Sequence, residues 1–174
     1  MKKLSLKKSP LVIIAVLCAA PAFAQEPVGC DKFKWNVDKE RALLASPDAA
    51  KVASGAQIDK PLAGAVKLAL VTFADAKLPT NPERMPKDAS TNAGFIRVAA
   101  LPKAGNYHIT LSEGAWIDVA QDGHYVKSGP FSGVEGCAGI RKTVTFTLAA
   151  APLVVQVSSV KANSIGIVIT PAAE

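Results

Sequence analysis

Apolar and polar residues alternate along three segments in the second half of the chain. Segments 107–111, 144–148 and 165–169 each carry an apolar residue at every second position. Alternation with a period of two is typical of a β-strand that buries one face. We therefore predict three strands, and in the first of them His108 is expected to point away from the core.

Four other segments are apolar at most of their positions, namely 66–73, 95–101, 115–120 and 153–157. Such runs favour strands that are buried on both faces or lie at the centre of a sheet. An N-terminal strand is expected over 33–37, and turn-forming residues at 103–106, 122–123 and 162–164 separate the later segments. Seven or eight short strands joined by turns predict an all-β fold, an antiparallel β-sandwich of jelly-roll-like form.

Helix is expected in one or two short turns only. Residues 38–44 suit two helical turns with Asp38 as the cap, although they also suit a continuation of the preceding strand. Ser46-Pro47-Asp48 is typical of a helix start and predicts a short helix through Val52. Residues 74–94, with three prolines, and 128–139, with four glycines, are predicted to be loops.

The first 24 residues have the pattern of a secretory signal peptide. Four lysines precede an apolar run from Leu11 to Ala20, and Ala22-Phe23-Ala24 supplies a small-residue cleavage site. Cys18 follows Leu17 rather than the small residue of a lipoprotein signal, so no membrane anchor is expected after cleavage. We predict a signal peptide at 1–24, one β-sandwich domain at 25–174, and a periplasmic or secreted location.

The basic character of the chain comes mainly from that leader. The whole sequence has 20 basic and 14 acidic residues, a net charge of +6. Removal of residues 1–24 removes four lysines and no acid, which leaves sixteen basic and fourteen acidic residues and a net charge of +2. So small an excess does not favour nucleic acid as a partner.

After cleavage the chain keeps two cysteines, Cys30 and Cys137. An even number of cysteines in an exported protein favours a disulfide. This bridge would close a loop of about 100 residues, for which chain entropy gives an upper value of about 4–5 kcal/mol. The alternative is a reduced nucleophilic or metal-binding thiol, which needs a neighbouring histidine, and neither His108 nor His124 is close in sequence. No metal or cofactor is expected.

Asp122-Gly123 predicts a tight β-hairpin, because this dipeptide suits a two-residue turn that matches the twist of the flanking strands. The resulting register places Trp116, Asp118, Tyr125 and Lys127 on one face. Two aromatic rings and an opposed acid–base pair are typical of a shallow platform for a sugar or a peptide. The alternative is that both rings pack under a loop and that Asp118 and Lys127 form an ordinary cross-strand pair.

Several segments together resemble a group of small exported proteins of Gram-negative bacteria whose activity is not established. These segments are Trp35 with 40–44, Ala93-Gly94-Phe95, 105–111, 115–119 and 137–148. The rhythm of a strand, then Ala-Gly-x-Tyr, then a strand is also similar to the pre-peptidase C-terminal domains of secreted hydrolases. The resemblance implies a β-sandwich built from hairpins and a disulfide, and it implies no particular chemistry.

The function predicted from the sequence is therefore binding without catalysis, with an envelope glycan or an envelope protein as the partner. The alternatives are a purely structural envelope protein and a small secreted enzyme. The enzyme would be metal-dependent and dioxygenase-like, with His108 and His124, or a hydrolase. Carboxylates available to such a site are Glu113, Asp118, Asp122 and Glu135. The sequence has neither a G-x-S-x-G nor an H-E-x-x-H motif.

Overall fold

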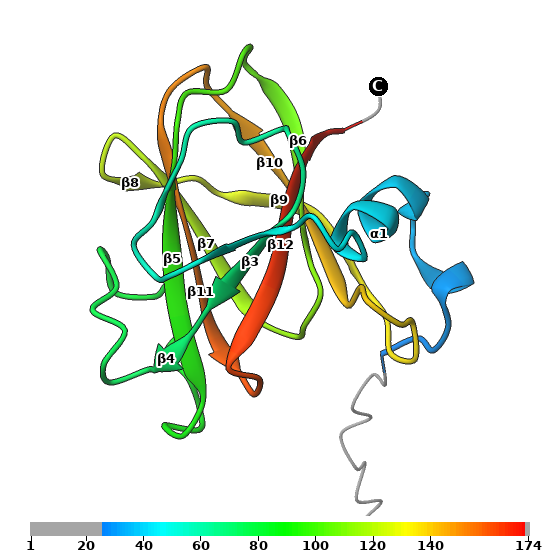
Figure 1. The fold of residues 1–174 in the computed structure, drawn as a ribbon, viewed down its shortest axis with the longest axis horizontal. Helices are drawn as coiled ribbons and strands as arrows, with labels where there is room; N and C mark the ends of the chain where they lie inside the picture. The colour runs from blue at the N-terminus through cyan, green and yellow to red at the C-terminus, as the bar shows by residue number, and fades with distance from the viewer. Residues whose placement is uncertain (1–25, 173–174) are drawn as a thin grey trace, which may run out of the picture.

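Two facing β-sheets form the body of the protein in the computed structural model, which describes residues 26–172 (Figure 1). Within these described residues a single α-helix lies outside the sheets. The all-β sandwich expected from the sequence is thus confirmed. The expected signal peptide at 1–24 lies outside the described residues.

Each sheet has an order that differs from the order of its strands along the chain. In the first sheet the order is β1 (Ala50–Val52), β3 (Val66–Ala69), β12 (Ser164–Pro171), β6 (Gly105–Leu111), β10 (Lys142–Leu148) and β9 (Ser128–Gly133). In the second it is β2 (Gln57–Ile58), β5 (Asn92–Val98), β11 (Leu153–Val160), β7 (Trp116–Gln121) and β8 (His124–Tyr125), with β4 (Val71–Thr72) also paired to β5.

The central strand pairs are antiparallel, as expected. The parallel pairs, β1 with β3 and β2 with β5, involve short strands at the sheet edges. The described residues form twelve strands instead of seven or eight. Strands of two or three residues are too short to show a periodic pattern, and they form because an existing strand offers unpaired backbone groups.

Apolar side chains at alternating positions of both sheets pack into one core. On β6, Tyr107 and Ile109 are buried while His108 between them is half-exposed, so His108 points away from the core as predicted. Side chains from both sheets fill the space between them, and the largest fully buried ones include Tyr107, Phe146, Leu68, Ile96 and Ile109. Burial of this apolar surface is the main favourable contribution to folding.

The N-terminal segment packs on the outside of the first sheet. It contains a short 3-10 turn, η1 (Cys30–Lys32), and α1 (Asp38–Leu44), which contacts β12. The predicted disulfide between Cys30 and Cys137 is present, with Cα atoms 4.9 Å apart. Around it lies a second, smaller apolar cluster formed by Val37, Val134, Cys137 and Ile140, with Phe33, Trp35 and Leu44 against it.

Three predictions near the N-terminus need correction. Residues 33–37 are not a strand, because Phe33 and Trp35 pack their rings on the disulfide cluster. The helix at 38–44 is present, but Val37 precedes it as the cap residue, and Asp38 donates its backbone N–H to Asn36 Oδ1 over 2.9 Å. The helix expected from 46 through Val52 is instead a turn, in which Ser46 Oγ accepts from the Asp48 N–H, followed by β1.

Two later segments also differ from expectation. Residues 66–73 form two strands rather than one, because the chain passes from the first sheet to the second at Leu70. The glycine-rich segment 128–139 begins with strand β9. A side chain at Gly129 would lie 3.2 Å from the carbonyl oxygen of Thr145, so the glycine permits a close approach to β10. The proline-rich segment is a loop as predicted, up to the start of β5.

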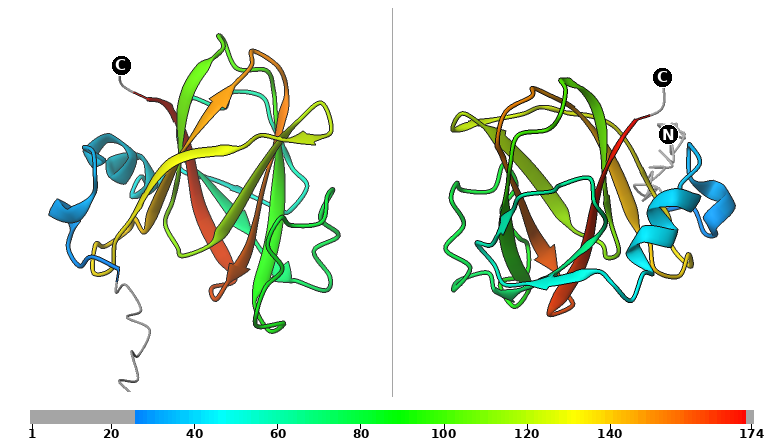
Figure 2. Two further views of the ribbon diagram at one scale, coloured as in Figure 1. Left: turned by 180° about the vertical axis from the view of Figure 1, so that it is seen from behind. Right: turned by 45° about the horizontal axis from the view of Figure 1, so that its top comes forward.

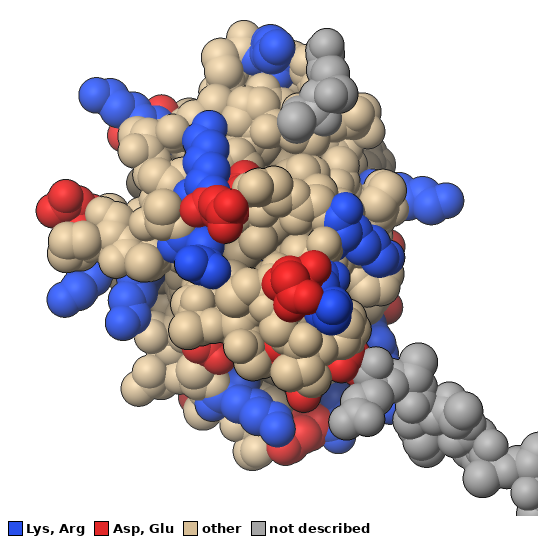
Figure 3. All heavy atoms as spheres, turned by 90° about the vertical axis from the view of Figure 1, so that its right-hand side faces the viewer, with Lys and Arg blue, Asp and Glu red and all other residues tan. Residues whose placement is uncertain are grey.

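Helix α1 and the proline-rich loop lie on opposite sides of the sandwich (Figures 1 and 2). On the side that carries α1, basic and acidic side chains of the described residues are interspersed (Figure 3). None of the helices in residues 26–172 has the length and apolar character needed to cross a membrane.

Candidate functional site

A cavity of about 560 Å³ opens at one edge of the sandwich, and residues from both sheets line it. Ile117 comes from β7 in the second sheet, and Val144 and Phe146 come from β10 in the first. These three side chains are buried and make an apolar floor. Around this floor lie Met85 and a set of aromatic, charged and hydroxyl groups, among them Trp116, Phe131, Lys142, Arg84, Glu26, Glu83, Asp88, Thr91 and Ser128.

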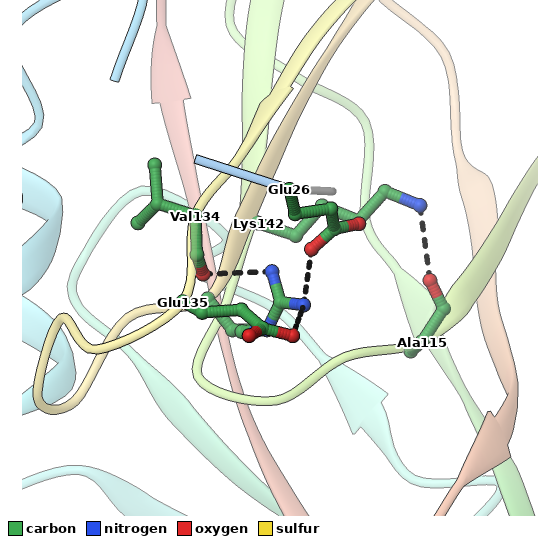
Figure 4. A network of polar contacts seen from close by, with 6 residues as sticks. Glu26, Ala115, Val134, Glu135 and Lys142 are labelled. Atoms are coloured by element: carbon green, nitrogen blue, oxygen red, sulfur yellow. Dashed lines mark hydrogen bonds and ion pairs between the residues drawn. The ribbon is translucent and has the colours of Figure 1, made fainter. Parts of the chain in front are cut away.

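Lys142 occupies an inward-facing position at the start of β10. It is in phase with Val144 and Phe146, which point into the core. Its Nζ donates to the carbonyl oxygen of Ala115 over 3.0 Å (Figure 4). The same nitrogen lies 5.8 Å from the ring centre of Trp116 and 5.9 Å from that of Phe131, within the range of a cation–π contact.

This setting lowers the pKa of Lys142 below its ordinary value. Burial is the main cause, because removal of water disfavours the charged ammonium form. The carboxylate of Glu26 acts in the opposite direction and raises the pKa, whereas the guanidinium groups of Arg141 and Arg84 lower it further. Lys142 is therefore a partly desolvated cation with one acidic group and two other cations nearby.

Arg141 neutralises the acidic groups on one side of the cavity. Its guanidinium donates to the carbonyl oxygen of Val134 over 2.7 Å and forms ion pairs with Glu26 and with Glu135, the latter at 3.4 Å. Figure 4 shows that Glu26 and Glu135 converge on this group, while the Lys142 ammonium points away toward Ala115. Glu26 is therefore already engaged at the cavity.

Trp116 is held in a fixed orientation by hydrogen bonds beneath the proline-rich loop. Its Nε1 donates to Asp118 Oδ1 over 2.7 Å, and Gln156 Nε2 donates to Asp118 Oδ2 over 3.2 Å. Gln156 also donates to the carbonyl oxygen of Thr80 and accepts from the Thr80 hydroxyl, which ties the loop to β11. From the same loop, the Arg84 guanidinium lies 5.5 Å from the Trp116 ring centre.

The predicted hairpin is present, and it brings only part of the predicted platform together. Ala120 pairs with Tyr125, and Asp122 and Gly123 both have positive φ, as the tight turn requires. Of the four candidate binding residues, Trp116 lines the cavity and Asp118 lies behind it. Tyr125 is partly exposed and donates its hydroxyl to the carbonyl oxygen of Asn81 in the loop.

The expected pairing of Asp118 with Lys127 is wrong. No ion pair in the described part of the chain joins them, because Asp118 is 2% exposed and bonded to Trp116 and Gln156, while Lys127 is exposed.

Sequence reasoning missed Lys142, Phe131 and Arg84. Lys142 carries a usable signal, because it extends the alternating pattern of 144–148 by one inward position and so places a charge in phase with core residues. Phe131 lies in the glycine-rich segment that was expected to be a loop. Arg84 lies in a loop without periodicity, and nothing in its sequence context indicates that it reaches Trp116.

The histidines of the alternative enzyme lie on different sheets. His108, on β6, points away from the core but stacks on the ring of Trp35 with centres 4.8 Å apart. His124 is exposed on β8. Across residues 26–172, no three His, Cys, Asp or Glu side chains form a group suited to a metal ion.

The carboxylates proposed for the alternative hydrolase lie in different surroundings. Asp118 is buried under the loop, Glu135 pairs with Arg141, and Glu113 is exposed between β6 and β7.

Comparison of the chain with protein-family models, with curated protein sequences and with solved structures finds no match.

Proposed function

We propose that this protein is an exported binding module that holds an envelope glycan in the cavity beside Trp116 without catalysing a reaction. The observation that carries the proposal is the combination of a fixed, half-buried indole with an apolar floor and several hydrogen-bond donors at one opening. Binding sites for small molecules have this composition, with mostly apolar walls and a few placed polar groups.

A sugar suits this opening because its ring has apolar C–H faces and polar edges. The indole of Trp116 and the exposed ring of Phe131 offer flat apolar surfaces for such faces. Hydroxyl groups of Thr91 and Ser128 and the ammonium of Lys142 lie around the same cavity and suit the sugar hydroxyls. Because Asp118 fixes the indole before binding, less conformational freedom is lost when the sugar binds.

Export to the periplasm or the medium is part of the proposal. It is supported by the leader pattern in the sequence and by the Cys30–Cys137 disulfide, since such bonds persist in oxidising compartments. Binding without catalysis is supported by the engagement of two of the three acids that line the cavity in other contacts. Glu26 pairs with Arg141, and Asp88 accepts from the backbone and the hydroxyl of Ser90.

The proposal is tested with a glycan array probed by the purified wild-type protein and by Trp116→Ala and Tyr125→Ala variants. Wild type and Tyr125→Ala are expected to bind the same glycans, because Tyr125 lies outside the cavity lining, and Trp116→Ala is expected to lose at least about tenfold in affinity. Trp116→Phe, which keeps a ring, should retain part of the binding if the site contacts a sugar face. A blank wild-type array, or equal binding by a folded Trp116→Ala protein, would overturn the proposal.

Metal analysis separates this proposal from the enzymatic alternative. The proposal expects no stoichiometric metal in the purified protein. A stoichiometric metal that is lost in a His108→Ala/His124→Ala double variant would support the enzyme instead.

A further inference from the structure

Three cationic side chains gather around the two aromatic rings at the cavity. Lys142 lies near both rings, the Arg84 guanidinium lies 5.5 Å from the centre of Trp116, and Lys34 lies 5.3 Å from the centre of Phe131. They come from three separate parts of the chain, namely β10, the proline-rich loop and the N-terminal segment. The fold therefore concentrates positive charge around these two rings.

The acidic groups nearby do not balance these cations. Glu26 is paired with Arg141, and Asp88 is bonded within its own turn to Ser90. Glu83 is the remaining acid among the residues that line the cavity. No ion pair within residues 26–172 involves Lys34, Arg84 or Lys142.

Positive charges held close together at a partly desolvated site repel one another more strongly than they would in water. Burial is the main cause of the lowered pKa of Lys142, and the charges of Arg141 and Arg84 lower it further, against the opposing effect of Glu26. An anion placed among these groups would relieve the repulsion and replace part of the lost hydration. An anionic group is thus the ligand chemistry that this charge distribution favours.

We infer that the glycan of this cavity is acidic and that its carboxylate or phosphate group lies between Lys142 and Arg84 beside the Trp116 ring. The inference rests on the proposed function and names the ligand class of the same site. Both cations lie within cation–π distance of the same ring, so the proposal places the anion beside that ring, where both charges attract it. The cavity volume lies within the range of about 300–1,000 Å³ that is usual for small-molecule sites.

The test uses sugars that are paired by charge on one array. Each acidic sugar is printed beside its neutral counterpart: glucuronate and glucose, galacturonate and galactose, and glucose 6-phosphate and glucose. Wild type is expected to bind the acidic member of a pair at least about tenfold more tightly, as expected for a charge-assisted hydrogen bond at a desolvated site. A preference confined to the uronates or to the phosphate identifies which anionic group the site takes.

Three variants test whether Lys142 is responsible for the preference for acidic sugars. Lys142→Gln removes the cation at the apolar floor of the cavity and is expected to abolish the discrimination between acidic and neutral members, whereas Lys142→Arg retains a cation and is expected to preserve it. Lys127→Gln is the matched control, because it makes the same charge change at an exposed residue that does not line the cavity. The control is expected to behave as wild type.

Each result of this experiment has a definite meaning. Equal or tighter binding of the neutral members, lost in Trp116→Ala, overturns the acidic ligand and leaves the glycan proposal in place. A preference for acidic sugars that survives in Lys142→Gln overturns the assignment of the anion to this cation. An absence of binding to every sugar contradicts both proposals together, and so does capture of decanoate, an apolar carboxylate, with no capture of sugars.

Discussion

The orientation of Trp116 depends on one buried side chain, Asp118. Its two carboxylate oxygens accept from Trp116 Nε1 and from Gln156 Nε2, and only 2% of its surface is exposed. Loss of one acceptor leaves a buried donor without a partner, which is unfavourable because that donor has lost its hydrogen bonds with water. Asp118 thus positions the ring of the proposed site without contacting the ligand.

We expect Asp118→Asn to destabilise the protein by about 1–3 kcal/mol, since the amide presents a donor where two acceptors are needed. Urea unfolding measures the effect. Lys127→Ala, at an exposed position, is the control and should lie within about 0.5 kcal/mol of wild type. A stability of Asp118→Asn equal to that of the control would show that these hydrogen bonds contribute little.

His108 makes stability depend on pH. Burial against Trp35 lowers its pKa, although the nearby carboxylate of Glu40 acts in the opposite direction. The folded state therefore favours neutral imidazole, and below about pH 6.5 the unfolded chain binds this proton more readily. The contribution of neutral His108 to stability is complete above that pH. It is lost as the pH falls toward the lowered pKa of His108 in the folded state.

Urea midpoints at about pH 7.5 and about pH 5.5 test this expectation. Wild type should lose more stability between them than His108→Phe, which keeps an aromatic ring against Trp35. An identical loss in both proteins would mean that other groups carry the pH dependence.

At the residue scale, the sequence predicts the strand face on which Trp116 lies and the outward direction of His108, because each follows from strand alternation. It does not predict the partners of Asp118. Gln156 lies 38 residues away, and the loop that buries both residues has no periodic pattern. Alternation fixes the face on which a side chain lies, whereas burial of that face depends on chain segments far away in sequence.

At the scale of elements, α1 depends on a glycine in the strand beneath it. A side chain at Gly166 would lie 2.9 Å from Leu44 Cδ2 and 3.2 Å from Ser112 Oγ. We expect Gly166→Val to displace the helix and to destabilise the protein by about 1–3 kcal/mol. Chemical denaturation with near-ultraviolet circular dichroism follows both effects.

Gly64→Val is the matched control for this substitution, because no atom lies within 4 Å of a side chain built there. It should change stability by less than about 0.5 kcal/mol. If Gly166→Val matched this control, Leu44 would not require the glycine.

Elements with strong local signals are those that the sequence predicts well. The Asp122-Gly123 hairpin and the long alternating strands need only neighbouring residues for their recognition. Strand β9 is different, since its glycines favour a loop locally and only its pairing with β10 makes it a strand. Pairing between segments compensates for weak local propensity, and a local sequence pattern carries no information about this pairing.

At the scale of the whole molecule, the disulfide joins two segments that are 107 residues apart. It holds the N-terminal segment, and with it Lys34, against the edge that carries β9 and Phe131. We expect a Cys30→Ser/Cys137→Ser protein to lose about 2–5 kcal/mol, because the unfolded chain gains freedom.

In the same variant the sandwich core remains intact, so the far-ultraviolet spectrum should keep its β-sheet form while proteolysis begins within residues 26–45. Unchanged stability and unchanged proteolysis would contradict this role for the bond.

The sandwich and the disulfide could both be predicted, but the cavity could not. Strand alternation and cysteine count are properties of the linear chain. The cavity forms where β7, β10, the proline-rich loop and the N-terminal segment meet, and that meeting is a result of sheet order. Its charge pattern is visible only after folding has brought Arg84 and Lys142 to one ring.

The most direct test of the glycan site is the fluorescence of Trp116 itself. The sequence has two tryptophans, and Trp35→Phe leaves Trp116 as the single reporter. That substitution keeps an aromatic ring beside His108 and removes a buried indole nitrogen for which no described residue provides a hydrogen bond. In a titration with the best glycan of the array, we expect a saturable change in Trp116 emission with the midpoint found by calorimetry. Calorimetric binding with no change in this emission would place the glycan elsewhere and contradict the account.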